Sequence, residues 1–176
     1  MSHPNNHLTD KKMKELLYDE TMIVRDLMRS LEGDELSPML VLLVGETGHR
    51  MVVSLAPVKG LDKHQMMFYA GQAISQKGHD ISGAILIAEA WAKEISKSEA
   101  WRAKQAGFPR PSKCPDRIEI VSITLRGLDG RGMIAMSKIA GEGAERRPSE
   151  WTFISPADYA KSEDNMLGEF FTGYGA

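Results

Sequence analysis

Residues 39–55, MLVLLVGETGHRMVVSL, contain the pattern that decides the fold. The unbroken apolar run from Met39 to Val44 is typical of a strand that is covered on both faces. Turn residues follow at 45–48, and every second residue is then apolar, at Met51, Val53 and Leu55. Two strands joined by so short a turn run antiparallel. The stretch therefore predicts a β-hairpin whose second strand is only half buried.

Helices are predicted on both sides of this hairpin. Before it, residues 10–31 have apolar side chains at the spacing of one helix face, with Thr9 as the N-cap. The members of this stripe are Met13, Leu16, Leu17, Val24, Leu27, Met28 and Leu31. After the hairpin, Asp62 and Gln65 have the spacing of a capping box, and Gly78 marks the end of a second helix.

The middle of the chain predicts two long strands separated by a polar excursion. Residues 82–91 are apolar on both faces, which is typical of a central strand. Strand character returns at 117–125, where the apolar set changes from one face to the other. Ile118 and Ile120 lie on the first face, and Val121, Ile123 and Leu125 lie on the second. A bulge, or burial on both faces, explains this change.

The chain ends in a hairpin, a short strand and a helix. Residues 128–132 predict a hairpin turn that leads into a strand at 133–139. A loop follows, and then a short strand at 151–154 and a helix at 156–171 with an acidic start.

These elements place the chain in the α+β class. Their order is α-β-β-α-β-β-β(-β)-α, with an antiparallel sheet of about five to six strands flanked by helices. We expect one domain over 9–172, a flexible segment at 1–8 and a tail at 173–176. The element order is similar to that of the sandwiches of the profilin and roadblock families and, more loosely, of small secretion chaperones. This is an analogy of fold, from which no function follows.

The composition is that of an ordinary globular domain. The chain has 176 residues, of which 42% are hydrophobic and 26% charged, and its net charge is −2. These values exclude disordered, collagen-like and coiled-coil chains. No apolar run approaches the ~18 residues of a membrane-spanning helix, and the start, MSHPNNHLTDKK, lacks the pattern of a secretory signal. The single cysteine fits a reducing compartment, so we expect a cytoplasmic protein without a membrane partner.

Three motifs are weak signals for chemistry. Residues 45–50, GETGHR, resemble a phosphate-binding loop, but a strand follows instead of a helix, which predicts a plain turn. Among the histidines, only His3 and His7 have metal-like spacing, and both lie in the segment expected to be flexible. A metal site usually needs three or four rigid, converging ligands, so we expect no metal and no cofactor. Cys114 has cationic neighbours that can activate a thiol, but no signature of a cysteine enzyme accompanies it.

An acidic cluster is the first candidate site. Glu89 lies in an otherwise apolar strand, and a buried carboxylate is unfavourable unless it is paired. Antiparallel pairing can bring Asp116 and Glu119, at the start of the following strand, toward Glu89. Three carboxylates can hold Mg²⁺, which makes a small metal-dependent hydrolase or nuclease an alternative function. A salt bridge from Glu89 to Arg117, or simple exposure of Glu89, is the structural explanation.

A basic excursion is the second candidate site. Residues 93–147 contain 12 basic and 7 acidic residues. Within them, 97–117 combine cations with aromatic rings, at Trp101, Arg102, Lys104, Phe108, Arg110, Lys113 and Arg117. Trp and Arg anchor protein interfaces, and cations interleaved with rings also bind single-stranded nucleic acid. The structural explanation is a solvated loop whose Trp101 tucks into the core. The small negative net charge argues against a dedicated nucleic-acid protein.

Part of the chain resembles a group of bacterial and phage proteins. The matching residues are Glu89-Ala90-Trp91, then Arg110-Pro111-Ser112, Pro115-Asp116-Arg117 and Glu119, within about 81–139. The resemblance implies a bacterial or phage origin and no activity, because these uncharacterised proteins have none assigned.

The expected function is therefore binding rather than catalysis. We expect an adaptor that contacts an acidic protein partner through 97–117. A homodimer is also expected, since small sheet proteins often cover an edge strand by self-association. The metal-dependent hydrolase or nuclease is the alternative, and nucleic-acid binding is the second alternative.

Overall fold

A computed structural model describes residues 7–45, 49–55, 57–107, 110–154 and 166–175. In these residues the helices are α1 (Asp10–Ser30), α2 (Lys63–Gln76), α3 (Lys97–Ala106) and α5 (Met166–Tyr174), with short 3₁₀ helices η1 (Pro111–Lys113) and η2 (Gly143–Glu145). The strands are β1 (Met39–Val44), β2 (His49–Ser54), β3 (Ile81–Ala92), β4 (Ile118–Gly127), β5 (Gly132–Ala140) and β6 (Arg147–Ile154). They form one antiparallel sheet in the order β2-β1-β3-β4-β5-β6.

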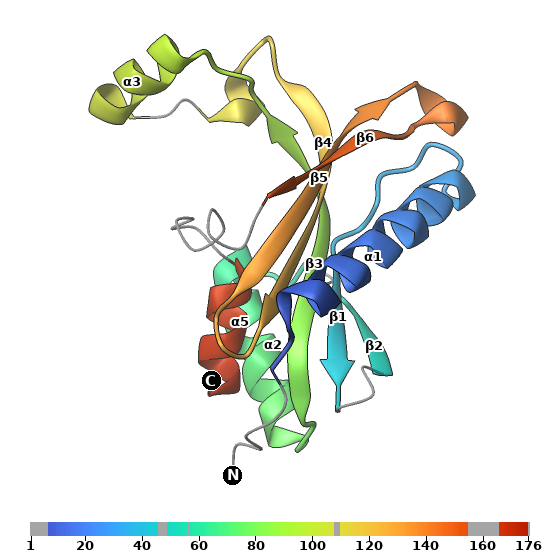
Figure 1. The fold of residues 1–176 in the computed structure, drawn as a ribbon. Coiled ribbons are helices and arrows are strands. Elements are labelled where there is room, and N and C mark those ends of the chain that lie inside the picture. Colours follow the sequence, from blue (N-terminus) through green and yellow to red (C-terminus); the bar gives the residue numbers. More distant parts are fainter. Residues whose placement is uncertain (1–6, 46–48, 56, 108–109, 155–165, 176) are drawn as a thin grey trace.

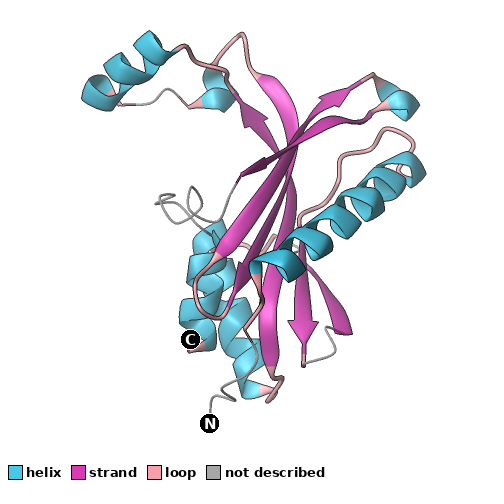
Figure 2. Cartoon of the chain, viewed as in Figure 1, coloured by secondary structure: helices cyan, strands magenta, loops and turns pink. Residues whose placement is uncertain are grey.

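The sheet separates two apolar cores. On one face, α1 packs its apolar stripe, including Leu17, against strand residues such as Ile123. On the other face, α2 and α5 cover a second core, in which Phe170 packs with Leu42. Figures 1 and 2 show the twisted sheet with α1 along one side and α2 and α5 on the other. The predicted α+β class, with helices flanking an antiparallel sheet, is confirmed.

The first two helices begin at the predicted caps. The Thr9 hydroxyl accepts a hydrogen bond from the Lys12 amide at 3.2 Å. Asp62 and Gln65 form the predicted capping box, each side chain accepting from the other residue's amide. Among the described helices, none combines the length and apolar character that crossing a bilayer requires.

Both ends of the domain differ from the prediction. Leu8, expected in a flexible segment, packs against the core under α1, and Arg131 Nη2 donates to its carbonyl at 2.7 Å. At the other end, α5 continues to Tyr174, whose hydroxyl donates to the His79 carbonyl at 2.8 Å. The predicted tail therefore starts inside a helix. The first part of the predicted last helix, 156–165, lies outside the described residues.

Two strands also correct the prediction. β6 starts at Arg147 rather than at 151, because an edge strand tolerates Pro148 and the polar residues after it. In β4 there is no bulge, since its register with β3 is continuous. The change of apolar face in β4 therefore reflects burial on both faces: Val121 lies under α1, whereas Ile118 and Ile120 point to the opposite face and are half-buried.

A buried carboxylate lies between α1 and the edge strand β2. Glu20 is 2% exposed, and its Oε2 is 2.7 Å from Nη1 of Arg50. Burial raises the pKa of Glu20 above its ordinary value, because desolvation outweighs the attraction of Arg50. The native state therefore binds a proton at Glu20 more tightly than the unfolded chain does, and the charged form lowers stability at neutral pH.

We expect Glu20→Gln to stabilise the protein at pH 7 by about 1 kcal/mol, or roughly 2–4 °C in Tm, because the neutral amide avoids the desolvation of a charge. The gain is complete above the folded pKa of Glu20. It disappears as the pH falls below the ordinary value of 4.5, where the wild-type carboxyl is protonated in both states. Thermal melts across this range measure it, with Glu15→Gln, exposed on the same helix, as the control. A gain that persists at the acid end would contradict the assignment.

Candidate functional site

An arm, residues 93–117, leaves the sheet between β3 and β4. The register of the two strands is continuous as far as Ala92 opposite Ile118, and the chain then departs from the sheet. Figure 1 shows α3 well away from the body, on the side of the sheet where α2 and α5 lie. The excursion predicted from the sequence is therefore an outward-projecting arm with a helix in it.

α3 forms because of its local sequence and not because of packing. The Ser96 hydroxyl accepts from the Glu99 amide at 3.2 Å, and the Glu99 carboxylate accepts from the Ser96 amide at 2.7 Å. These hydrogen bonds lower the pKa of Glu99. No residue of this 10-residue helix is buried, and Trp101 is 65% exposed. Isolated helices shorter than ~12–15 residues are marginal in water, so α3 depends on its capping box for stability.

The root of the arm is anchored to the sheet. The Arg117 guanidinium lies 4.1 Å from the centroid of the Trp91 ring. The Nζ of Lys93 is 3.4 Å from Asp116 Oδ2, and the free thiol of Cys114 is buried. These contacts fix the direction in which the arm leaves the sheet, whereas its tip remains open to solvent.

The predicted partner-binding residues divide into three groups. The exposed group comprises Trp101, Arg102, Lys104, Arg110 and Lys113. None of its four cations forms an ion pair with another described residue. Arg117 belongs to the anchored root, and Phe108 lies outside the described residues. Trp101 is exposed instead of packing in the core. The structural explanation of the excursion, a solvated loop whose Trp101 tucks into the core, is therefore wrong for this residue.

The structure does not bring the three predicted acidic residues together. Glu89 and Glu119 converge, but on a cation from the β5–β6 hairpin: Arg146 Nη2 lies 2.7 Å from Glu89 Oε2 and 3.2 Å from Glu119 Oε2. Asp116 pairs with Lys93 instead, because it precedes the first residue of β4 that pairs with β3. In the part of the chain that the structure describes, no three His, Cys, Asp or Glu side chains are grouped so that they could hold a metal ion.

Arg146 also replaces Arg117 as the predicted salt-bridge partner of Glu89. The guanidinium is 10% exposed, and its hydrogen bonds to Glu89 raise the pKa of Arg146. The arginine therefore remains charged and compensates the two carboxylates where a cation would otherwise be needed. The three side chains therefore form one ion cluster that ties the β5–β6 hairpin to β3 and β4.

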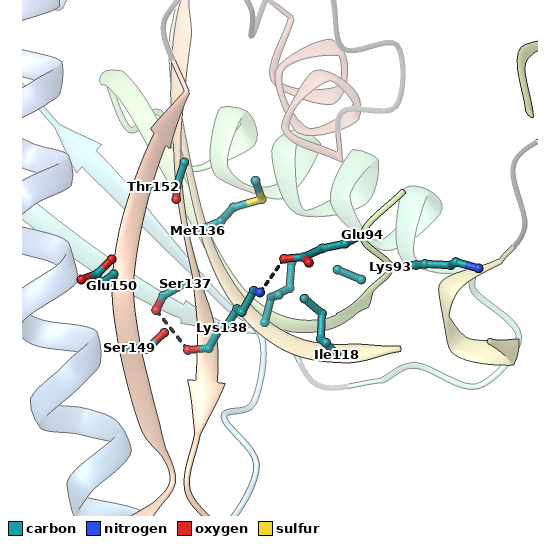
Figure 3. Close-up of a pocket in the computed structure, with 11 residues that line it drawn as sticks. Lys93, Glu94, Ile118, Met136, Ser137, Lys138, Ser149, Glu150 and Thr152 are labelled. Atoms are coloured by element: carbon teal, nitrogen blue, oxygen red, sulfur yellow. Dashed lines mark hydrogen bonds and ion pairs between the residues drawn. The ribbon is translucent and has the colours of Figure 1, made fainter. Parts of the chain in front are cut away.

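A groove at the foot of the arm was not predicted from the sequence. It has a volume of ≈ 570 Å³ and lies across the ends of β3, β4, β5 and β6. Its lining residues are Ala92, Lys93, Glu94, Ile118, Ile120, Met136, Ser137, Lys138, Ser149, Glu150 and Thr152. Figure 3 shows Met136, Lys138 and Ile118 pointing into this space, and Lys138 forms an ion pair with Glu94 across it.

A β-bulge shapes the β6 wall of the groove. Ser137 pairs with Trp151 and Ile139 with Pro148, so Lys138 alone lies opposite both Ser149 and Glu150. Bulges re-aim side chains and are common beside binding sites. All three residues at this bulge line the groove. The irregular register therefore concentrates polar groups at the rim of an apolar floor.

Comparison of the chain with protein-family models, with curated proteins and with solved structures finds no match. The similarity of element order to the profilin and roadblock sandwiches therefore remains an analogy. The arm and the groove are the two features of the structure that bear on function.

Proposed function

We propose that the chain is a non-catalytic binding protein that uses the arm to contact an acidic protein partner. The observation that supports this most is α3, a helix with no buried residue that presents Trp101 to solvent. Burying a large apolar side chain stabilises a fold, yet here the indole is held outside it. Tryptophan and arginine are the residues most enriched where protein interfaces gain their affinity, and Arg102 is the next residue in the helix.

Unpaired charge supports an acidic partner. Arg102, Lys104, Arg110 and Lys113 have no carboxylate partner among the described residues, so an acidic surface would complement them and steer association. The free Cys114 supports a reducing compartment, and we therefore propose the cytoplasm as the site of action. A bacterial or phage origin remains a prediction from the resemblance.

A homodimer remains a second prediction about partners. β2 and β6 lie at the two edges of the sheet, and an edge strand leaves backbone donors and acceptors that a second copy can pair. We do not propose the hydrolase, because Glu89 and Glu119 are compensated by Arg146 and Asp116 lies elsewhere.

The triple variant Trp101→Ala, Arg102→Ala, Arg110→Ala tests the proposal. We expect it to reduce capture of acidic partner proteins from the native host at least tenfold, because it removes the aromatic anchor and two of the unpaired cations of the arm. Its Tm should stay within roughly 2 °C of wild type, since none of the three side chains is buried. Quantitative mass spectrometry of affinity captures and thermal melts give the two readouts.

α1 offers a matched control. Tyr18→Ala, Arg25→Ala, Arg29→Ala also removes one exposed ring and two exposed or half-exposed arginines, but far from the arm, and should capture the same partners as wild type. Equal capture by the arm variant would contradict the proposal. Captures that disappear after nuclease treatment, and an affinity for single-stranded oligonucleotides that falls steeply with salt, would favour nucleic-acid binding instead.

A further inference from the structure

On the sheet face that α2 and α5 cover, the part next to the arm has no described helix packed against it. The core beneath α2 and α5 extends along β3 only to Leu86, and β3 becomes partly exposed from Ala88 to its end. Side chains on this face of β3 are then alanines, at Ala88, Ala90 and Ala92. Because these side chains are small, they leave space above the sheet instead of filling it. The groove lies at the end of this stretch.

The floor of the groove is apolar. Ile118 and Ile120 from β4 and Met136 from β5 are half-buried there beside Ala92. Its ≈ 570 Å³ is within the range of about 300–1,000 Å³ of sites that bury a ligand. Covering apolar surface contributes roughly 25 cal/mol per Å², so an occupant with apolar side chains would be stabilised there.

Within the described chain, three of the four charged residues that line the groove are compensated, all except Glu150, whereas the exposed cations of α3 and η1 are not. Lys138 pairs with Glu94, and Lys93 pairs with Asp116. The cations further along the arm have no such partner among the described residues. A complementary occupant is therefore apolar where it meets the groove and acidic where it meets the arm.

We propose that the groove and the arm together bind one acidic segment of a partner protein, with its apolar side chains in the groove and its carboxylates on the arm cations. This inference rests on the proposed function of the arm, and it adds a second contact surface and the chemistry of the bound segment. Ser149, which the bulge places at the rim, supplies a hydroxyl for the backbone of such a segment. Trp101 contributes an apolar contact at the other end.

An unbiased peptide selection tests the proposal. A library of random peptides displayed on phage is selected on the full-length protein, and the enriched peptides are synthesised with a fluorescent label. We expect sequences with apolar residues clustered toward one end and Asp or Glu toward the other. Replacing the apolar residues of a selected peptide by serine, or its carboxylates by amides, should each weaken binding at least tenfold in fluorescence anisotropy.

Variants of the protein assign the two surfaces. Met136→Glu places a charge in the groove, and Ala92→Leu fills the groove without burying a charge. Each should weaken peptide binding at least tenfold, as should the arm triple variant. Val52→Glu, at an exposed site on the edge strand β2, is the matched control and should change the affinity less than twofold. Circular dichroism confirms that each variant is folded.

The outcomes separate this inference from the proposed function. If the arm variant loses the peptides but Met136→Glu and Ala92→Leu keep them, the groove plays no part, the inference is wrong and the proposed function stands. If only the groove variants lose them, the arm is not the binding surface and both are wrong. Selection of no peptide, or of peptides without acidic residues, overturns the inference. So does sedimentation showing self-association that Ala92→Leu abolishes, because the occupant is then a second copy.

Discussion

Gly71→Ala is expected to lower the Tm by roughly 6–12 °C, the equivalent of about 3 kcal/mol in a chain of this length. Gly71 lies inside α2, and a Cβ added there would come within 2.0 Å of the Phe170 carbonyl oxygen in α5. The contact is repeated in the opposite direction, because a Cβ on Gly173 of α5 would lie 2.0 Å from the Phe68 carbonyl oxygen of α2. Both clashes are with backbone, so no side-chain rotation relieves them and the helices must separate.

Separation is unfavourable because α5 supplies the largest buried side chains of the core that it shares with α2. Leu167, Phe170 and Phe171 are all buried there. Admitting water to such side chains, or leaving a cavity beneath them, costs about 2–5 kcal/mol for each side chain fully lost from the core. The estimate of about 3 kcal/mol therefore corresponds to partial undocking of α5.

The clash and the helix propensity of alanine change the Tm of Gly71→Ala in opposite directions, so the sign of the change distinguishes between them. At an exposed position inside a helix, alanine is more favourable than glycine by about 1 kcal/mol, so propensity alone would raise the Tm. Ser75→Ala, exposed on α2, is the control and should be neutral or slightly stabilising. Gly173→Ala should resemble Gly71→Ala, and the double variant should lose less than the sum, because both changes separate the same pair of helices. A Tm that stays the same or rises in thermal melts would mean that α2 and α5 do not pack this closely.

The regular elements of the fold were predictable because local and tertiary requirements agree in them. The stripe of α1, the capping box at Asp62 and the hairpin at 39–55 each combine a propensity with a matching burial pattern. β6 was predicted too short because edge strands bury little, so Pro148 and its polar neighbours obscure the alternation. The close approach at Gly71 depends on Phe170 in α5, which is distant in the sequence, and no local pattern predicts such a contact.

The candidate site was only half predictable, for a related reason. Cations, Trp101 and the Ser96-x-x-Glu99 capping signature are local, so the sequence predicts a basic arm. The partner of Glu89 is not local, because Arg146 comes from a hairpin 57 residues away. One feature of the sequence points to the groove: Ile118 and Ile120 are apolar but lie on the face of β4 opposite Val121, Ile123 and Leu125. Such a pair predicts burial on both faces, but not that the second face lacks a helix.

Arg146→Met is expected to lower the free energy of unfolding by about 2–4 kcal/mol, somewhat less than for a fully buried ion pair because the site is partly solvated. Arg146 donates to Glu89 Oε2 at 2.7 Å and to Glu119 Oε2 at 3.2 Å. Glu89 is 13% exposed and also accepts from the Leu36 amide at 2.9 Å. Without the guanidinium, two carboxylates in a partly buried site lose their compensating cation.

The cluster connects segments that are distant in sequence, so its loss should loosen a defined region. Arg146 Nη1 donates to the Asp34 carbonyl at 3.4 Å, and a Cβ on Gly33 would lie 2.4 Å from the Gly143 carbonyl carbon. The loop after α1 thus touches the tip of the β5–β6 hairpin. We expect amide hydrogen exchange to accelerate at 33–36 and 143–147 in Arg146→Met, and much less in the core of α1.

A double variant distinguishes the contribution of the charge of Arg146 from that of the packing of its side chain. Glu89→Gln combined with Arg146→Met removes a carboxylate together with the arginine, so the double variant should be more stable than Arg146→Met alone, by about 1–2 kcal/mol in urea denaturation. Arg147→Met, exposed beside Arg146, should change the free energy of unfolding by less than about 0.5 kcal/mol. If the double variant were as unstable as the single one, the methylenes of Arg146 rather than its charge would be what holds the hairpin. Because β6 and its bulge begin within three residues of Arg146, that distinction also determines whether charge or packing keeps the wall of the groove in place.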